Sequence, residues 1–140
     1  MPTYRTASEE ATIQLGEELS RTWAGKRAVL LIGNLGAGKT TMAKGIVRGL
    51  GAAEADEVSS PTFTLIHEYR GPHVNVYHVD LYRVDTPRQL ETLGLDDLIA
   101  ENSVLLLEWG EKFQRFVDER DVEIQIEHLG EDERRIRILT

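Results

Sequence analysis

One short run of the sequence has the composition of a phosphate-binding loop. Residues 33–40 read GNLGAGKT and match the pattern G-x-x-x-x-G-K-[ST] at every fixed position. Glycines permit positive φ, so backbone N–H groups can turn inward around an anion. In this pattern Lys39 reaches the β- and γ-phosphates of a nucleotide, and the Thr40 hydroxyl binds Mg²⁺. The run therefore predicts a nucleoside triphosphate site that uses Mg²⁺.

Two acidic residues could complete such a site, because a P-loop protein needs an acid near the bound Mg²⁺. Glu108 directly follows residues 104–107, an apolar run typical of a buried parallel strand, and is favoured as the metal-side acid. Asp80 follows residues 74–79, whose alternation predicts a half-exposed strand. It could position the attacking water or a metal-bound water. A transition-metal site is disfavoured, since the 4 histidines lack H-x-x-x-H spacing and there is no cysteine.

The residues on either side of the loop predict the elements that would hold it. Residues 28–32, AVLLI, form an apolar run of strand length directly before Gly33. Apolar residues then recur every fourth position over residues 42–50, which indicates a helix that begins near Lys39. The positive end of that helix dipole would point at the bound phosphates.

One helix is predicted before this unit and two strands after it. Thr6 and Glu9 have capping-box spacing, and an apolar stripe follows them, so a helix is expected over about residues 8–22. Residues 63–69 and 74–79 have the composition of strands, and the Gly-Pro between them could close a hairpin.

The remaining pattern predicts the fold class. Thr86, with Pro and Gln after it, is typical of a helix start, and that helix should stop at Gly94, before a short one over residues 95–101. Residues 122–126 and 136–138 alternate and predict a terminal antiparallel hairpin. We therefore expect one α/β domain over residues 1–140, a P-loop NTPase-like mixed β-sheet with helices packed on it and hairpins in its later half.

Composition limits the classes of protein that remain. The chain has 140 residues, 16 basic against 24 acidic side chains, and a net charge of −8. Such a charge argues against unaided binding to a nucleic-acid backbone. The absence of cysteine excludes disulfides and thiolate metal sites. No apolar run reaches the ~18 residues of a membrane span, and no signal-peptide pattern is present, so a cytoplasmic protein is expected.

Missing motifs narrow the kind of nucleotide protein. A GTPase would need an Asn-Lys-x-Asp guanine reader, and no asparagine here is followed by lysine, so ATP is favoured. A small nucleoside or metabolite kinase remains an alternative, although little chain is left for an acceptor pocket and a lid. A third possibility is an adaptor that senses the nucleotide without hydrolysing it.

Four blocks of the sequence resemble one known family. They are GNLGAGKTT at 33–41, SPTFTL at 60–65, HVDLYR at 78–83 and LEW at 107–109. Their sequences, order and spacing are similar to those of the TsaE family, formerly called YjeE, bacterial ATPases of threonylcarbamoyladenosine biosynthesis. The resemblance covers roughly residues 6–126.

The resemblance implies a P-loop ATPase with weak intrinsic turnover. In its ATP-bound form it would dock on the partner proteins TsaB and TsaD, which attach threonylcarbamoyl to adenosine 37 of tRNA. Hydrolysis would reset that complex, and TsaD would carry out the transfer.

The resemblance also implies roles for individual residues. Thr40 and Glu108 would hold Mg²⁺, and Thr62 would lie near the γ-phosphate in a switch-like segment. The catalytic residues would be Lys39, Thr62, Asp80 and Glu108. Residues near the nucleotide would be Glu9, Leu35, Gly36, Ala37, Gly38, Lys39, Thr40, Thr41 and Arg134.

Overall fold

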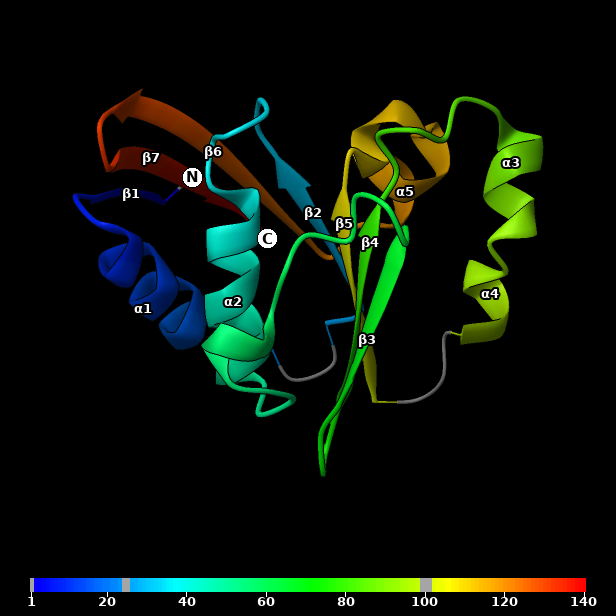
Figure 1. Ribbon diagram of the computed structural model, residues 1–140, viewed down its shortest axis with the longest axis horizontal. Coiled ribbons are helices and arrows are strands. Elements are labelled where there is room, and N and C mark those ends of the chain that lie inside the picture. Colours follow the sequence, from blue (N-terminus) through cyan, green and yellow to red (C-terminus); the bar gives the residue numbers. More distant parts are fainter. Residues whose placement is uncertain (1, 24–25, 99–101) are drawn as a thin grey trace.

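A seven-stranded mixed sheet forms the centre of the computed structural model, which describes residues 2–23, 26–98 and 102–140. Its strands are β1 (Thr3–Thr6), β2 (Ala28–Ile32), β3 (Ile66–Arg70), β4 (Asn75–Asp80), β5 (Ser103–Glu108), β6 (Val122–Gly130) and β7 (Glu133–Leu139). Their order across the sheet is β1-β7-β6-β2-β5-β4-β3 (Figure 1). The pairs β6–β2, β2–β5 and β5–β4 are parallel, and the outer pairs are antiparallel. This architecture confirms the predicted fold class.

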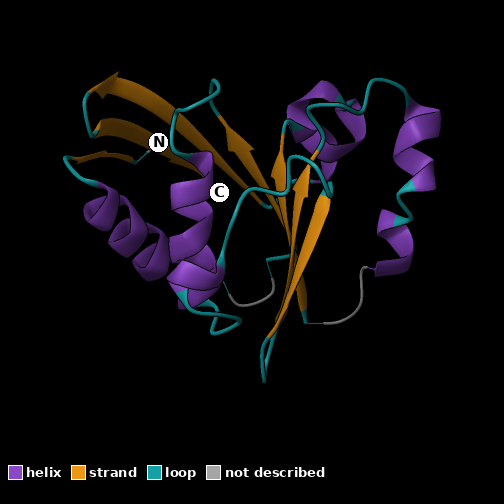
Figure 2. Cartoon of the chain, viewed as in Figure 1, coloured by secondary structure: helices purple, strands orange, loops and turns teal. Residues whose placement is uncertain are grey.

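Helices cover both faces of the sheet (Figure 2). One face carries α1 (Glu9–Ser20) and α2 (Lys39–Gly49), and the other carries α3 (Pro87–Thr92), α4 (Leu95–Leu98) and α5 (Gln114–Glu119). Successive side chains of a strand point to opposite faces. Leu31 therefore packs in the core under α2, whereas Leu30 packs with Phe116 of α5. No helix in the described ranges is long and apolar enough to cross a membrane.

The N-terminal segment differs from its prediction. β1 forms an edge strand that pairs with β7. Its four residues are too few to show a strand pattern beside the helix signal that follows. The N-cap of α1 is Ser8, whose hydroxyl accepts a hydrogen bond from the Ala11 N–H at 3.0 Å. The capping box predicted for Thr6 and Glu9 is therefore wrong. The Thr6 hydroxyl is buried and instead hydrogen-bonds Thr12 Oγ1 at 2.7 Å.

The predicted hairpin of β3 and β4 is present, with two corrections. β3 begins at Ile66 because a turn precedes it, closed by a 2.7 Å hydrogen bond from the Leu65 N–H to the Pro61 carbonyl. The strand before Asp80 is also not half-exposed, since β4 is buried between β3 and β5. The polar member of its alternation, His78, is fully buried because its ring pairs with a carboxylate of β5.

The later elements agree more closely with prediction. The capping box of α3 is present: the Gln89 N–H donates to Thr86 Oγ1 at 3.1 Å, and the Thr86 N–H donates to Gln89 Oε1 at 3.2 Å. The short helix expected over residues 95–101 is α4, and residues 99–101 lie outside the described part of the chain. The terminal hairpin is β6–β7. The pattern does not predict α5, or the 3₁₀ turns η1 (Ala55–Glu57) and η2 (Gly110–Lys112), all of which are short.

The close packing of α1 on α2 depends on Gly45. A Cβ atom at this position would lie 2.1 Å from the backbone oxygen of Ile13. Alanine normally stabilises a helix relative to glycine. We nevertheless expect Gly45→Ala to lower the free energy of unfolding by about 2 kcal/mol, because the helices must separate. Urea denaturation measures this, with Gln14→Ala on the exposed face of α1 as the control. An unchanged or higher urea midpoint for Gly45→Ala would contradict this account of the packing.

Candidate functional site

The loop between β2 and α2 leaves the start of α2 open to a ligand. Gly36 and Gly38 have φ values of 78° and 109°, conformations that side chains disfavour. Gly38 is the N-cap residue of α2, which has neither a side-chain cap nor an acidic residue in its first turn. The first N–H groups of a helix lack partners within the helix. Here they are available to an anion, as the motif predicts.

A cavity of about 280 Å³ lies beside this helix terminus. Its lining comes from the loop and first turn of α2, the segment before β3, the ends of β4 and β5, and β7. These residues are Leu35, Gly36, Gly38, Lys39, Thr40, Thr41, Ser60, Thr62, Asp80, Glu108, Trp109 and Arg134. Most of the residues predicted to bind or act on a nucleotide are thus brought together.

The parallel register places the two predicted acids next to each other. Asp80 and Glu108 are opposite each other in the pairing of β4 with β5, and Glu108 is opposite Leu31 of β2. Each acid is only 4% exposed. Both therefore end buried parallel strands, so strand exposure does not distinguish the metal-side acid as the sequence indicated.

Different groups hold the two carboxylates. Asp80 accepts hydrogen bonds from residues on loops: Thr62 Oγ1 at 3.2 Å and the Tyr82 N–H at 2.9 Å. Glu108 Oε2 is paired with Nε2 of the fully buried His78 on the neighbouring strand. His78 thus engages one carboxylate oxygen of Glu108, and the other, Oε1, makes no hydrogen bond to the described part of the chain.

Lys39 has an unusual environment for a lysine. Its side chain is buried, and its Nζ has no hydrogen-bond partner among the described residues. It lies 3.9 Å from the centroid of the Trp109 ring, a cation–π contact. Burial lowers the pKa of Lys39, while the nearby carboxylates of Glu108, Glu111 and Asp80 act in the opposite direction. A buried ammonium without acceptors is suited to an anionic ligand.

Trp109 is held in a strained conformation next to Glu108. Its φ of 62° is in the left-handed region, which non-glycine residues adopt rarely. The Trp109 ring packs against the Tyr82 ring, with centroids 5.1 Å apart. These contacts hold the indole ring in the position where the Lys39 ammonium contacts it.

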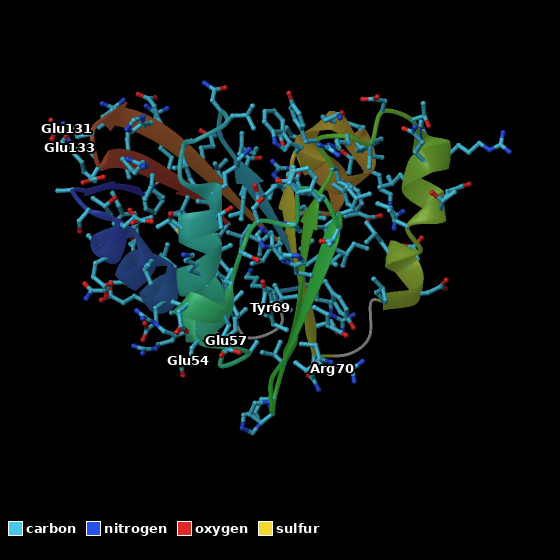
Figure 3. All side chains as sticks on the ribbon, in the orientation of Figure 1. Glu54, Glu57, Tyr69, Arg70, Glu131 and Glu133 are labelled. Atoms are coloured by element: carbon cyan, nitrogen blue, oxygen red, sulfur yellow. The ribbon has the colours of Figure 1, made fainter. Side chains whose placement is uncertain are left out.

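The segment before β3 brings Thr62 to Asp80. The Ser60 and Thr62 hydroxyls are 2.7 Å apart, and the Asp80 N–H donates to the Leu65 carbonyl at 2.9 Å. The start of the segment is anchored by Tyr69 of β3, whose hydroxyl accepts from the Ser59 N–H at 3.4 Å. Figure 3 shows Tyr69 beside Glu57 near the end of α2, and burial raises the pKa of this tyrosine.

The structure separates Arg134 and Glu9, which were both expected near the nucleotide. Arg134 lines the cavity, and its guanidinium lies so close to Gly38 that a Cβ there would be 2.9 Å from Nε. Glu9 is exposed in the first turn of α1 and does not line the cavity. Ala37 is buried and lines a neighbouring cavity instead.

Sequence reasoning missed the groups that support the acids. His78 was not predicted as a site residue, although its position two residues before Asp80 puts both side chains on one face of β4. Tyr82 was also missed as the backbone donor to Asp80. A hydrogen bond made by a backbone N–H leaves no signal in residue type.

The residues fit a magnesium nucleotide. Mg²⁺ prefers oxygen ligands and is usually held by one or two carboxylates together with phosphate oxygens. The cavity offers the Thr40 hydroxyl and the Asp80 and Glu108 carboxylates. Within the described residues no group of three or more His, Cys, Asp or Glu could hold a metal unaided. The unpartnered Lys39 ammonium suits the phosphates themselves.

Comparison with known proteins identifies the family. The family model described as "Threonylcarbamoyl adenosine biosynthesis protein TsaE" matches residues 6–136. The chain belongs to the TsaE family. The TsaE protein of Haemophilus influenzae is 40% identical over 111 residues, 79% of this chain and 68% of that protein. The TsaE protein of Bacillus subtilis is 38% identical over 134 residues, which are 95% of this chain and 82% of that protein.

The fold agrees with a solved structure. The crystal structure of Bacillus subtilis YdiB superimposes with a TM-score of 0.71 at 34% identity, over 96% of this chain and 82% of that chain. Membership of the TsaE family places the protein in tRNA threonylcarbamoyladenosine biosynthesis.

The buried Lys39 ammonium makes the ligand-free protein less stable than it could be. Because the pKa of Lys39 is lowered in the folded state, folding disfavours its charged form. We expect Lys39→Met to raise the urea midpoint of the ligand-free protein at pH 7. The stability difference between Lys39→Met and the parent should shrink as the pH rises through the folded-state pKa of Lys39. It should disappear above the ordinary value of 10.5, where Lys39 is neutral in the folded and in the unfolded protein. A lower midpoint at pH 7 would mean that the three carboxylates outweigh burial.

Proposed function

We propose that the protein binds ATP with Mg²⁺ in this cavity and hydrolyses it slowly to ADP and phosphate. The observation that carries the proposal is the buried, unpartnered Lys39 ammonium at the open terminus of α2, facing the same cavity as Asp80 and Glu108. This TsaE-family activity would serve tRNA threonylcarbamoyladenosine biosynthesis.

Each residue would have a separate task. The N–H groups of the loop and Lys39 would bind the phosphates and orient them. Thr40 and Glu108 would hold Mg²⁺, which supplies positive charge where negative charge develops on the phosphates. Asp80, fixed by Thr62 and Tyr82, would orient the attacking water.

Substitutions in this set should separate binding from turnover. We expect Lys39→Ala to lose most nucleotide binding, because it removes the buried ammonium at the start of α2 and leaves Arg134 as the cationic side chain of the cavity lining. Glu108→Gln should reduce phosphate release by about 100-fold or more while ATP affinity without Mg²⁺ changes little. Lys44→Ala removes a lysine of α2 outside the cavity and is the control.

Phosphate release with Mg²⁺-ATP, and nucleotide binding by calorimetry, measure these effects. Full turnover by Lys39→Ala would overturn the proposal. Transfer of phosphate to an added nucleoside or metabolite, without release in its absence, would identify a kinase instead.

We propose further that the ATP-bound protein docks on TsaB and TsaD through the rim of the cavity. Three of the four exposed large apolar side chains in the described ranges lie on the segments that form the site: Leu35, Phe63 and Tyr82. Phe63 is 83% and Leu35 69% exposed. Apolar side chains that surround a binding site favour a protein partner.

Co-elution with purified TsaB and TsaD, with and without ATP, tests this docking. We expect Phe63→Ala to weaken the ATP-dependent complex by about tenfold, as the loss of an aromatic anchor does. Tyr4→Ala removes the fourth exposed apolar side chain, on the edge strand β1, and should leave the complex unchanged. Equal effects of the two substitutions would place the docking surface elsewhere.

A further inference from the structure

Lys112 makes an unusual set of contacts at the end of η2. Its ammonium donates to three backbone carbonyls, those of Leu81 at 3.1 Å, Tyr82 at 3.0 Å and Val84 at 2.7 Å. An ammonium group has three N–H donors, so all of them are used. The Asp85 carboxylate lies 3.5 Å from the same nitrogen. A single side chain from the segment after β5 therefore holds the loop that follows β4.

That loop controls the position of several groups in the cavity. The N–H of Tyr82 donates to Asp80 Oδ1, and the Leu81 N–H donates to the Glu108 carbonyl at 2.9 Å. The Tyr82 ring packs on Trp109, which in turn lies against Lys39. Tyr82 is thus linked to the predicted catalytic acid through its N–H, to the predicted phosphate-binding lysine through its ring, and to Lys112 through its carbonyl.

We propose that Lys112 is a positioning residue of the hydrolytic site. By holding the carbonyls of residues 81, 82 and 84 it keeps the Tyr82 N–H directed at Asp80 and the Tyr82 ring against Trp109. The Asp80 carboxylate then stays oriented toward the cavity. This inference rests on the proposed ATPase function for its kinetic consequence, but the hydrogen bonds it describes exist without nucleotide.

The geometry requires lysine rather than arginine. The tetrahedral ammonium directs its donors toward three oxygens around one point, whereas a planar guanidinium spreads its donors in a fork. Arginine keeps the charge but cannot reproduce this arrangement. The role therefore depends on the shape of the donor group as well as on its charge.

The lack of cysteine in the chain allows an atom-level test. Lys112→Cys removes the ammonium, and alkylation of that single thiol with 2-bromoethylamine forms a C–S bond with loss of bromide and returns an ammonium at nearly the lysine length. Lys44→Cys, treated in the same way, is the matched control. In each protein we would measure kcat and KM for Mg²⁺-ATP, and hydrogen exchange of the Tyr82 amide by NMR.

We expect Lys112→Cys to lower kcat by about tenfold, which corresponds to 1.36 kcal/mol of transition-state free energy. KM should change less than about threefold, because the phosphate-binding loop is untouched. Exchange of the Tyr82 amide should speed up, and alkylation should restore both kcat and protection. Lys112→Arg should keep neither the parent's kcat nor the parent's protection of the Tyr82 amide in full. The Lys44→Cys protein should behave like the parent before and after alkylation.

Three results would overturn the proposal. They are an unchanged kcat in Lys112→Cys, Tyr82 exchange equal to that of the parent, or a loss of activity that alkylation leaves in place while the protein remains folded. Failure of the proposed ATPase function would be visible separately, as absence of phosphate release from the unmodified protein. The Tyr82 exchange and its recovery on alkylation would then decide the positioning role alone.

Discussion

The parallel pairing of β4, β5 and β2 brings the carboxyl ends of three strands to one edge of the sheet, where Asp80, Glu108 and the loop that begins at Gly33 meet. Nothing in the loop itself determines which acids face it. The register does, because a slip of one residue would turn each acid to the other face of its strand. The apolar side chains on both faces of β5 hold that register. A slip in either direction along the strand would move them out of their packing with the helices on both faces of the sheet.

Charge at this edge is balanced without direct pairing to lysine. Lys39 lies near three carboxylates, yet hydrogen-bonds to none of the described residues. A close ion pair would have to be broken before phosphates could bind. The Trp109 ring instead provides a weak contact that leaves the N–H donors of the ammonium free. An ammonium held in this way could accept an anion without first breaking an ion pair.

The elements with strong sequence patterns could be predicted from the sequence alone. Gly38, Lys39 and Thr40 could be placed at the start of a helix because motif, strand and helix signals agreed. The role of β4 could not be predicted, because a buried histidine has the same signal in an alternating pattern as an exposed one. His78 is buried only because Glu108, 30 positions away, provides its partner. Such a pairing between strands is a property of the fold.

The supports of the two acids differ in a way that matters for their roles. Glu108 is held by a fully buried side chain on an adjacent strand, so its position changes only if the sheet does. Asp80 is held by Thr62 and Tyr82, which lie on loops at the surface. Loops have fewer packing contacts and open at lower free energy than core strands. Glu108 is therefore the more rigidly placed of the two acids, whereas the orientation of the Asp80 carboxylate depends on the loops that carry Thr62 and Tyr82.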